Sequence, residues 1–317
     1  MASVESIQEA IDRLPRVWLG EWPTPLYFCK RLTEELGGPR IFMKRDDLTG
    51  LAFGGNKTRY LEFTLAEALD QGADAVVQGM VDCVRGAIED GGISEIQAVG
   101  VGAPGPLDPF EGVMISPENL QCMHGVRLKE QLEAALNLPV VVDNDANMAA
   151  FGEQWLGAGR GVDHFLCVTL GTGVGGGWVS NGQLMHGFNG NAAEVGHITV
   201  DWNGPLCPCG NYGCLEQYVS ATAMVRRTRE KLEAEQRPET ALRSEGLTTQ
   251  AIFEAAEAGD GFALQMFEEI GFLLGVGLVS LVNVLNVERI ALAGGLAQAG
   301  QRIFEPTRRV FVERGTV

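Results

Sequence analysis

Residues 165–177 read FLCVTLGTGVGGG, and the interpretation of the whole sequence starts from this stretch. Its first part, Phe165–Leu170, is a mostly apolar run that predicts a buried strand. Its second part, residues 171–177, predicts a glycine-rich loop, in which missing Cβ atoms let backbone N–H groups turn toward an anion such as phosphate. A tight turn without any ligand gives the same pattern, so both alternatives stay open for this stretch alone.

Helices and strands alternate on both sides of this stretch. After it, we expect a cysteine-rich insertion, a long helix from Glu216, helices at 249–258 and 261–284, a strand Arg289–Ala293 and a helix at 302–313. Before it, we expect helices at 5–13, 28–36, 57–70, 80–90, 126–136 and 145–156, and strands Ile41–Arg45, Ala75–Val77, Ile96–Val101 and Val140–Val142. This alternation indicates an α/β fold.

The composition excludes several classes of protein. The 317 residues are 45% hydrophobic and 21% charged, which suits two or three domains with sizeable cores and rules out a disordered or fibrous chain. With 24 basic and 41 acidic residues, the net charge of -17 would repel nucleic acids and anionic membranes. The apolar stretch 270–287 is too short and too polar to span a bilayer, so it predicts a buried helix. The N-terminus shows no secretory signal.

Three of the seven cysteines lie together and give the most specific signal in the sequence. Cys207, Cys209 and Cys214 follow His197, and three thiolates with one imidazole are the ligand set of a closed, structural, tetrahedral zinc site. The alternative is an unligated trio in a loop, which would expose reactive thiols. The scattered placement of the other cysteines indicates a reducing cytoplasm rather than a disulfide framework.

Two further clusters follow predicted strands. Residues 143–147 read DNDAN at the end of one strand and the start of a helix, a position where open α/β sheets bind ligands. Taken alone, this cluster is better explained by Asp143 or Asn144 capping the helix. Residues 291–295 read ALAGG, where Gly294 and Gly295 would permit close approach of a ligand.

Together, six segments strongly resemble the ROK family of bacterial sugar kinases and repressors from roughly Met80 onward: GAPGP (102–106), DNDAN (143–147), GTGVGGG (171–177), EVGH (194–197), CPCGNYGCLE (207–216) and AGG (293–295). The resemblance implies an actin-like, ribonuclease-H-like fold of two lobes that close on a hexose and Mg-ATP. It implies that Asp145 is the general base on the sugar hydroxyl. By the same resemblance, other hydroxyls would contact Asn144, Glu194, His197 and Glu216, ATP phosphates would face Gly171, Thr172 and Gly173, and adenosine would face Gly294 and Gly295. His197 would ligate zinc through one ring nitrogen and touch sugar with the other.

Both ends of the sequence depart from the family pattern. Family kinases begin with a turn of the type Asp-x-Gly-Gly-Thr that grips the outer phosphates and the metal, and no such turn stands before Met80. Family chains also continue with a further strand and helix, whereas this sequence stops at Val317. We therefore expect a kinase fold that lacks its first strands and is truncated at its C-terminus. Weak hexose binding with ATP turnover near background is the expected behaviour, because lost phosphate donors act on transition-state charge.

The segment before Met80 resembles a different family. Thr24-Pro25-Leu26, residues 42–49 (FMKRDDLT) and residues 54–62 (GGNKTRYLE) look like the opening of D-cysteine desulfhydrases and aminocyclopropane-carboxylate deaminases. These are pyridoxal-phosphate (PLP) enzymes of fold type II, and the resemblance implies Lys57 as the Schiff-base lysine. A solvated lysine in a first helical turn is the alternative. The phosphate cup of that family is missing, so we do not expect Lys57 to hold PLP tightly.

The sequence is therefore interpreted as a chimera, with residues 1–79 as the PLP-type fragment, 80–160 as the remainder of the kinase N-terminal lobe and 161–317 as its C-terminal lobe with the zinc loop. The leading function is ATP-dependent, glucokinase-like phosphorylation of a hexose or hexose derivative. The alternatives are a PLP-dependent desulfhydrase or deaminase and a non-catalytic protein that binds sugar or zinc. We expect sugar and ATP as partners, no nucleic acid or membrane, a cytoplasmic location, and a homo-oligomer in keeping with the family.

Overall fold

A computed structural model of the chain describes residues 26–28, 42–44, 72–91, 96–117, 120–234 and 239–315. The chain divides into two compact units. The first, unit 1, comprises Met1–Val99 and Val113–Val140, and the second, unit 2, comprises Gly100–Gly112 and Val141–Val317. The predicted boundaries at 79/80 and 160/161 refer to the lobes of the family fold and remain predictions.

Unit 1 contains short strands and three helices among its described residues. These elements are β1 (Leu26–Phe28), β2 (Phe42–Lys44), α4 (Ala73–Gly91), β5 (Val113–Met114), η2 (Gln121–Met123) and α5 (Leu128–Leu136). Strands β1 and β2 are antiparallel. Helix α4 is tied to α5 by the Arg85 guanidinium, which donates to the Ala135 carbonyl at 2.9 Å.

The predicted strand Ala75–Val77 is wrong, because these residues form the start of α4. Val77 and Val81 are both buried, and Val84 and Ile88 continue the same row as partly buried side chains. This spacing of three to four residues is that of one helix face. The predicted helix 80–90 is therefore confirmed as the later part of a longer helix.

Strands β3 (Val99–Ala103) and β6 (Val140–Asn144) form a two-stranded sheet, and β6 runs directly into α6 (Asp145–Leu156). The sequence correctly predicts α6 and most of β6. This strand-to-helix junction places residues 143–147 at one end of β6, where their side chains can be shared between the helix start and a ligand.

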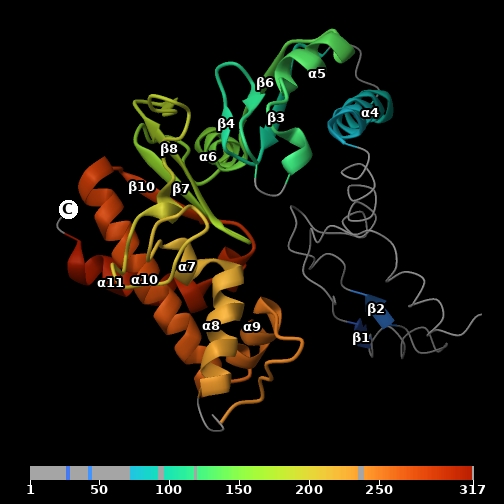
Figure 1. Ribbon diagram of the computed structural model, residues 1–317. Helices are drawn as coiled ribbons and strands as arrows, with labels where there is room; N and C mark the ends of the chain where they lie inside the picture. The colour runs from blue at the N-terminus through green and yellow to red at the C-terminus, as the bar shows by residue number, and fades with distance from the viewer. Residues whose placement is uncertain are drawn as a thin grey trace, which may run out of the picture. The chain divides into compact units, whose positions relative to one another are not determined.

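The sheet of unit 2 has four strands in the order β10-β7-β8-β9, and Figure 1 labels three of them, β7, β8 and β10. They are β7 (Phe165–Leu170), β8 (Val174–Ser180), β9 (Gln183–Leu184) and β10 (Arg289–Ala293). Strand β7 runs parallel to β10 and antiparallel to β8. Its side chains alternate between two cores, since Leu166 and Val168 belong to the main helical core while Phe165 and Cys167 pack with Ala150 of α6. Burial on both faces explains why this strand is apolar throughout.

Helices make up most of the rest of unit 2. Its remaining elements are β4 (Leu107–Asp108), η3 (Val195–His197), α7 (Glu216–Val219), α8 (Ala221–Ala234), α9 (Thr249–Glu257), α10 (Gly261–Leu285), η4 (Leu296–Ala299) and α11 (Gln301–Arg314). The single long helix predicted from Glu216 is wrong, because Ser220 adopts an extended backbone (φ -75°, ψ 161°) that separates α7 from α8. The Ser220 hydroxyl then accepts a hydrogen bond from the Ala223 N–H at 3.0 Å, as a helix cap does.

Helix α10 is long and apolar enough to cross a membrane by length and composition, but many of its side chains belong to the core of unit 2. Met266, Ile270 and Leu274 are fully buried. Helix α11 packs along it (Figure 1), and the two helices approach closely at Gly271 and Gly275. A Cβ on Gly275 would lie 2.7 Å from the Val310 Cβ, which explains the glycine there. These contacts agree with the buried helix that the sequence predicts.

Candidate functional site

The junction of β6 and α6 positions the first functional side chains. Asn144 is the N-cap of α6, and its Oδ1 atom accepts hydrogen bonds from Ala146 N at 2.9 Å and Asn147 N at 3.4 Å. The cap that the sequence offered as an alternative is therefore present. The cap does not account for Asp145, the first residue of the helix, whose carboxylate accepts hydrogen bonds from neighbouring backbone N–H groups, including that of Ala146 at 2.9 Å.

Asp145 opens into a pocket of unit 2, called here the Asp145 pocket. Its lining residues are Gly105, Leu107, Asn144, Asp145, Ala146, Asn147, Gly175, Gly176, Gly190, Asn191, Ala192 and Glu194. One wall is the start of α6 and the other is the loop of residues 185–194. The sequence names Asn144, Asp145 and Glu194 as site residues, and the structure brings these three together around one pocket.

The surroundings alter the acidity of two carboxyl groups at this pocket. Protein atoms around Asp145 desolvate it and raise its pKa above the ordinary value of 3.8, although backbone N–H groups oppose the shift. Desolvation also raises the pKa of Glu194, with smaller contributions from the nearby Glu216 and Asp145 charges, while His197 lowers it. Raised carboxyl pKa values in a concave site are typical of general bases and acids.

The glycine-rich stretch is only partly a loop. Residues 171–173, the glycine turn, connect β7 to β8, but residues 174–177 belong to β8, so the prediction of a loop over 171–177 is wrong. A Cβ on Gly175 would lie 2.8 Å from the Ala146 Cβ, and one on Gly177 would lie 2.9 Å from the Ala146 carbonyl oxygen. These glycines therefore let α6 pack closely on the sheet. The glycine turn alone remains as a candidate phosphate cradle.

The glycine turn and the pair Gly294-Gly295 lie at the same edge of the sheet. Strands β7 and β10 are parallel, with Thr169 paired to Ala293, so both strands end side by side. Gly294 has a φ of +91°, and a Cβ there would lie 2.9 Å from the Leu170 backbone nitrogen. Ligands of open α/β sheets bind at such carboxyl ends. The structure thus places the two predicted nucleotide segments together.

Glu216 joins this edge from α7. Its Oε2 atom accepts a hydrogen bond from Val174 N at 2.9 Å, and a Cβ on Gly173 would collide with the same carboxylate. Gly171 accepts a bond from the backbone N–H of Ala221 at 2.8 Å, which attaches the start of α8 to the turn. The carboxylate predicted to hold a hydroxyl therefore also fixes the conformation of the glycine turn.

The four predicted zinc ligands converge. The ligand atoms of His197, Cys207, Cys209 and Cys214 all lie within 4.8 Å of one another. Two pairs, Cys207 Sγ with His197 Nδ1 and Cys209 Sγ with Cys214 Sγ, are 3.7 Å apart. A tetrahedral ion with metal–sulfur bonds of about 2.3 Å holds its sulfur ligands about 3.8 Å from one another. Burial and the neighbouring sulfurs raise the pKa of Cys214 to about 12, so a cation is needed to keep three thiolates together. The residues fit zinc.

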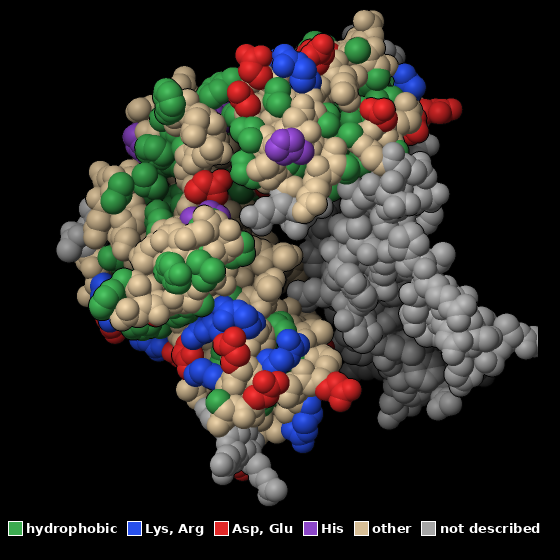
Figure 2. All heavy atoms as spheres, in the orientation of Figure 1, with side chains coloured by type: hydrophobic (Ala, Val, Ile, Leu, Met, Phe, Trp, Pro, Cys, Tyr) green, Lys and Arg blue, Asp and Glu red, His purple; other side chains and the backbone are tan. Residues whose placement is uncertain are grey.

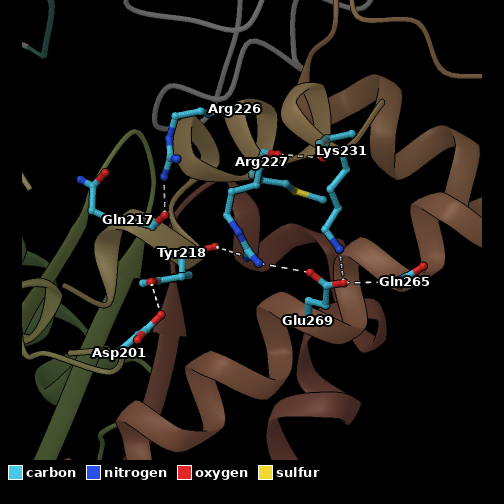
Figure 3. A network of polar contacts seen from close by, with 10 residues as sticks. Asp201, Gln217, Tyr218, Arg226, Arg227, Lys231, Gln265 and Glu269 are labelled. Carbon is cyan, nitrogen blue, oxygen red and sulfur yellow. Dashed lines mark hydrogen bonds and ion pairs between the residues drawn. The ribbon is translucent and has the colours of Figure 1, made fainter. Parts of the chain in front are cut away.

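A polar network fixes the cysteine loop, residues 199–214, to the helices (Figure 3). The Tyr218 hydroxyl on α7 donates to Asp201 in this loop at 2.8 Å. The Arg227 guanidinium of α8 donates to the Tyr218 carbonyl at 3.3 Å and to Glu269 of α10 at 3.1 Å (Figure 3). Lys231 adds a second cation at Glu269. The basic side chains seen over α8 in Figure 2 are thus largely paired with acidic ones.

His186 lies in the 185–194 loop, and no pattern in the sequence marks it as a functional residue. Its Nε2 atom lies 2.7 Å from Oδ2 of Asp143, a carboxylate that the sequence considered only as a helix cap. No spacing rule links the two residues, because their contact is made by the fold. The pairing of a buried Asp with a His was therefore not accessible from sequence. Lys57, the alternative PLP lysine, lies outside the described residues.

Comparison with known proteins gives the class of this fold and site. The family model of the ROK family matches residues 50–314 of this chain. The chain is 42% identical over 222 residues to a glucokinase from Halalkalibacterium halodurans, covering 69% of this chain and 67% of that protein. A ROK family glucokinase from Streptomyces griseus, solved in complex with glucose and AMPPNP, matches with a TM-score of 0.65 and 36% identity over 76% of this chain and 79% of that chain.

A xylose repressor from Bacillus subtilis is also similar, at 31% identity over 66% of this chain and 51% of the repressor. Fold and site therefore define an actin-like sugar-kinase domain with α/β architecture. The chain belongs to the ROK family.

The family match corrects the predicted join near Met80. It starts at residue 50, so it crosses the predicted boundary and takes in residues that the sequence reasoning gave to a PLP enzyme. The chimera is thus unsupported.

Proposed function

We propose that this chain binds a hexose in the Asp145 pocket and transfers the terminal phosphoryl group of ATP to one hydroxyl of that sugar. The observation that carries the proposal is the convergence of Asn144, Asp145 and Glu194 on one pocket, which Gly175 and Gly176 of β8 also line. The similarity to glucokinases supports a glucose-like substrate.

The chemistry follows from the position of Asp145. Its carboxylate accepts the proton of the attacking hydroxyl as the sugar oxygen bonds to the terminal phosphorus and the bond to the ADP oxygen breaks. The raised pKa of Asp145 makes it a better proton acceptor than an ordinary aspartate. The products are a sugar phosphate and ADP, and the proton leaves from Asp145 to solvent.

The remaining polar groups orient the sugar. Asn144 uses its Oδ1 atom for the helix cap, so its amide N–H groups remain for a hydroxyl. Glu194, on the opposite wall, would accept hydrogen bonds from sugar hydroxyls. His197 presents Nε2 toward Glu194, 4.0 Å from its carboxylate, while Nδ1 faces the cysteines. A zinc ion held by His197 and the three cysteines would supply no chemistry to the transfer and would keep the His197 ring in this orientation.

The phosphate side is weaker than in an intact family member. The glycine turn and Gly294-Gly295 are in place, and Mg²⁺ bound with ATP would neutralise phosphate charge. No turn of the type Asp-x-Gly-Gly-Thr stands before Met80, so the carboxylate of that turn is missing from the phosphate side. Removing one group that stabilises transition-state charge commonly costs about 10²–10³ in rate. We therefore infer a slow kinase with its sugar side intact.

A coupled assay of ADP release with a panel of hexoses tests this proposal. Turnover is expected to depend on a hexose and to disappear in Asp145→Asn. Asp163→Asn, at an exposed loop residue of the same unit, is the matched control and should leave turnover unchanged. ADP release that needs no sugar, or that survives Asp145→Asn, would contradict the assignment of the base. Sugar binding without any turnover would instead favour a sensor, the kind of protein that the similarity to a xylose repressor suggests.

A further inference from the structure

Asp143 is a buried carboxylate that holds three donors. Only 5% of the residue is exposed. Its Oδ1 atom accepts hydrogen bonds from the backbone N–H of Asn144 at 2.7 Å and from Nδ2 of Asn147 at 2.9 Å. Its Oδ2 atom accepts from Nε2 of His186 at 2.7 Å. A carboxylate with this many short, charge-assisted bonds in a buried position is rigidly held.

These donors come from opposite sides of the Asp145 pocket. Asn144 and Asn147 belong to the wall formed by the start of α6, next to Asp145. His186 begins the loop that forms the other wall, where Asn191, Ala192 and Glu194 line the pocket. The His186 carbonyl accepts a bond from the Ala192 N–H at 3.1 Å, so the loop is folded back on His186.

The His186 ring is fixed from a second direction. The Phe110 ring packs edge-on against it, with ring centroids 5.7 Å apart. The side chain of His186 is 26% exposed, so water does not surround the contact. The His186 ring cannot rotate freely, because the edge of Phe110 and the buried carboxylate of Asp143 both hold it. The loop of residues 185–194, which carries His186, is restrained with it.

We propose that the Asp143–His186 pair is a positioning device that holds the two walls of the Asp145 pocket at a fixed separation, so that Glu194 and Asp145 meet one sugar. This inference rests on the proposed function and adds two positioning residues to it. Neither residue is needed to touch the substrate.

The orientation of Asn147 follows from the same carboxylate. Because Nδ2 donates to Asp143, the Oδ1 atom is turned away from it. Among the residues that the structure describes, this buried oxygen has no hydrogen-bond partner, although Asn147 is only 2% exposed and lines the pocket. A buried oxygen left this way is satisfied by a ligand hydroxyl or a water. Asp143 therefore also directs an acceptor into the sugar space.

Variants of His186 test the device, because this residue lies on a loop and its replacement should leave the core intact. His186→Leu removes the donor to Asp143, whereas His186→Gln keeps an N–H donor at a similar reach. The matched control is His164→Gln, since His164 contacts Ser180 away from the pocket. Each variant is measured for KM of the hexose, kcat, and amide hydrogen exchange of residues 185–194.

We expect His186→Leu to raise the hexose KM roughly ten-fold and to lower kcat/KM by up to about a hundred-fold, because displacements of about 1 Å have such costs. Exchange in the 185–194 loop should become faster in the same variant. His186→Gln should restore both properties most of the way, and His164→Gln should match the unmodified chain.

Equal kcat/KM and equal loop exchange in His186→Leu and the unmodified chain would overturn the proposal. So would a His186→Gln variant as impaired as His186→Leu, since the hydrogen bond would then not be the cause. If the unmodified chain phosphorylates no hexose, the proposed function fails, yet the exchange measurements still decide whether the pair restrains the loop.

Discussion

His197 Nδ1 lies 3.7 Å from Cys207 Sγ, which leaves Nε2 of the same ring facing the Glu194 carboxylate 4.0 Å away. One imidazole thus belongs to the cysteine cluster and to the edge of the Asp145 pocket. Loss of metal from the cluster would free this ring and, through Cys214, loosen the chain that leads into Glu216 on α7. The metal site and the sugar site are therefore expected to fail together.

The first prediction is one zinc ion per chain, released by Cys214→Ser. Binding energy at a structural zinc site is also folding energy, so the variant should lose about 10 °C in Tm and bind hexose more weakly. Elemental analysis and calorimetry measure both. Cys83→Ser, at an exposed cysteine of α4, is the control and should change neither. Protein purified with freely titratable thiols and no zinc would refute the prediction.

The second prediction separates packing glycines from ligand-facing ones. Gly177→Ala places a Cβ against Ala150 and the Ala146 carbonyl, and such overpacking should reduce the free energy of unfolding by about 1–3 kcal/mol. Gly171→Ala meets no atom within 4 Å and should unfold like the unmodified chain. Denaturant titration of both variants is the measurement. Equal stability of the two would show that α6 does not pack against β8 as described.

The third prediction concerns pH. In the proposed reaction Asp145 accepts a proton only when it is deprotonated, so turnover should be lost as pH falls through the pKa of this carboxyl group. Because burial raises that pKa above 3.8, the acid limb of kcat/KM should lie above the range of an ordinary aspartate.

The same raised pKa means that the folded chain holds the proton of Asp145 more tightly than the unfolded chain. Its contribution to stability is therefore fully present below 3.8 and is lost as pH rises through the raised value.

The variant Asp145→Asn provides the comparison, because its hexose-dependent turnover should be absent at every pH. Turnover in Asp145→Asn with the same acid limb as the unmodified chain would assign the titration to another group.

Long periodic elements of this fold could be predicted from sequence. Strand β7 and helix α6 were predicted with their observed ends, because a continuous apolar run and a polar cap are local signals. The short apolar run of residues 75–77 favours a strand, yet the row Val77, Val81, Val84 shows helical spacing. The break at Ser220 could not be seen, since the long-range contacts of the adjoining helices decide it.

The candidate site likewise contains residues that the sequence predicts and contacts that it does not. The cysteine cluster and residues 144–145 could be predicted because their chemistry is concentrated in short segments. The role of Gly175 and Gly177 was misread, because a glycine that admits a helix and a glycine that admits a phosphate look alike in sequence. The Asp143–His186 contact joins residues 43 positions apart and depends on the folded loop.

Titration calorimetry of the zinc-containing chain with a panel of hexoses tests the central claim most directly, when it is followed by an assay of hexose-dependent ADP release on the same samples. We predict measurable, weak binding of at least one hexose that Asp145→Asn leaves largely intact. We also predict turnover at about a hundredth of an intact family member or less, abolished by Asp145→Asn. A folded, zinc-loaded chain that binds no hexose at all would contradict the account.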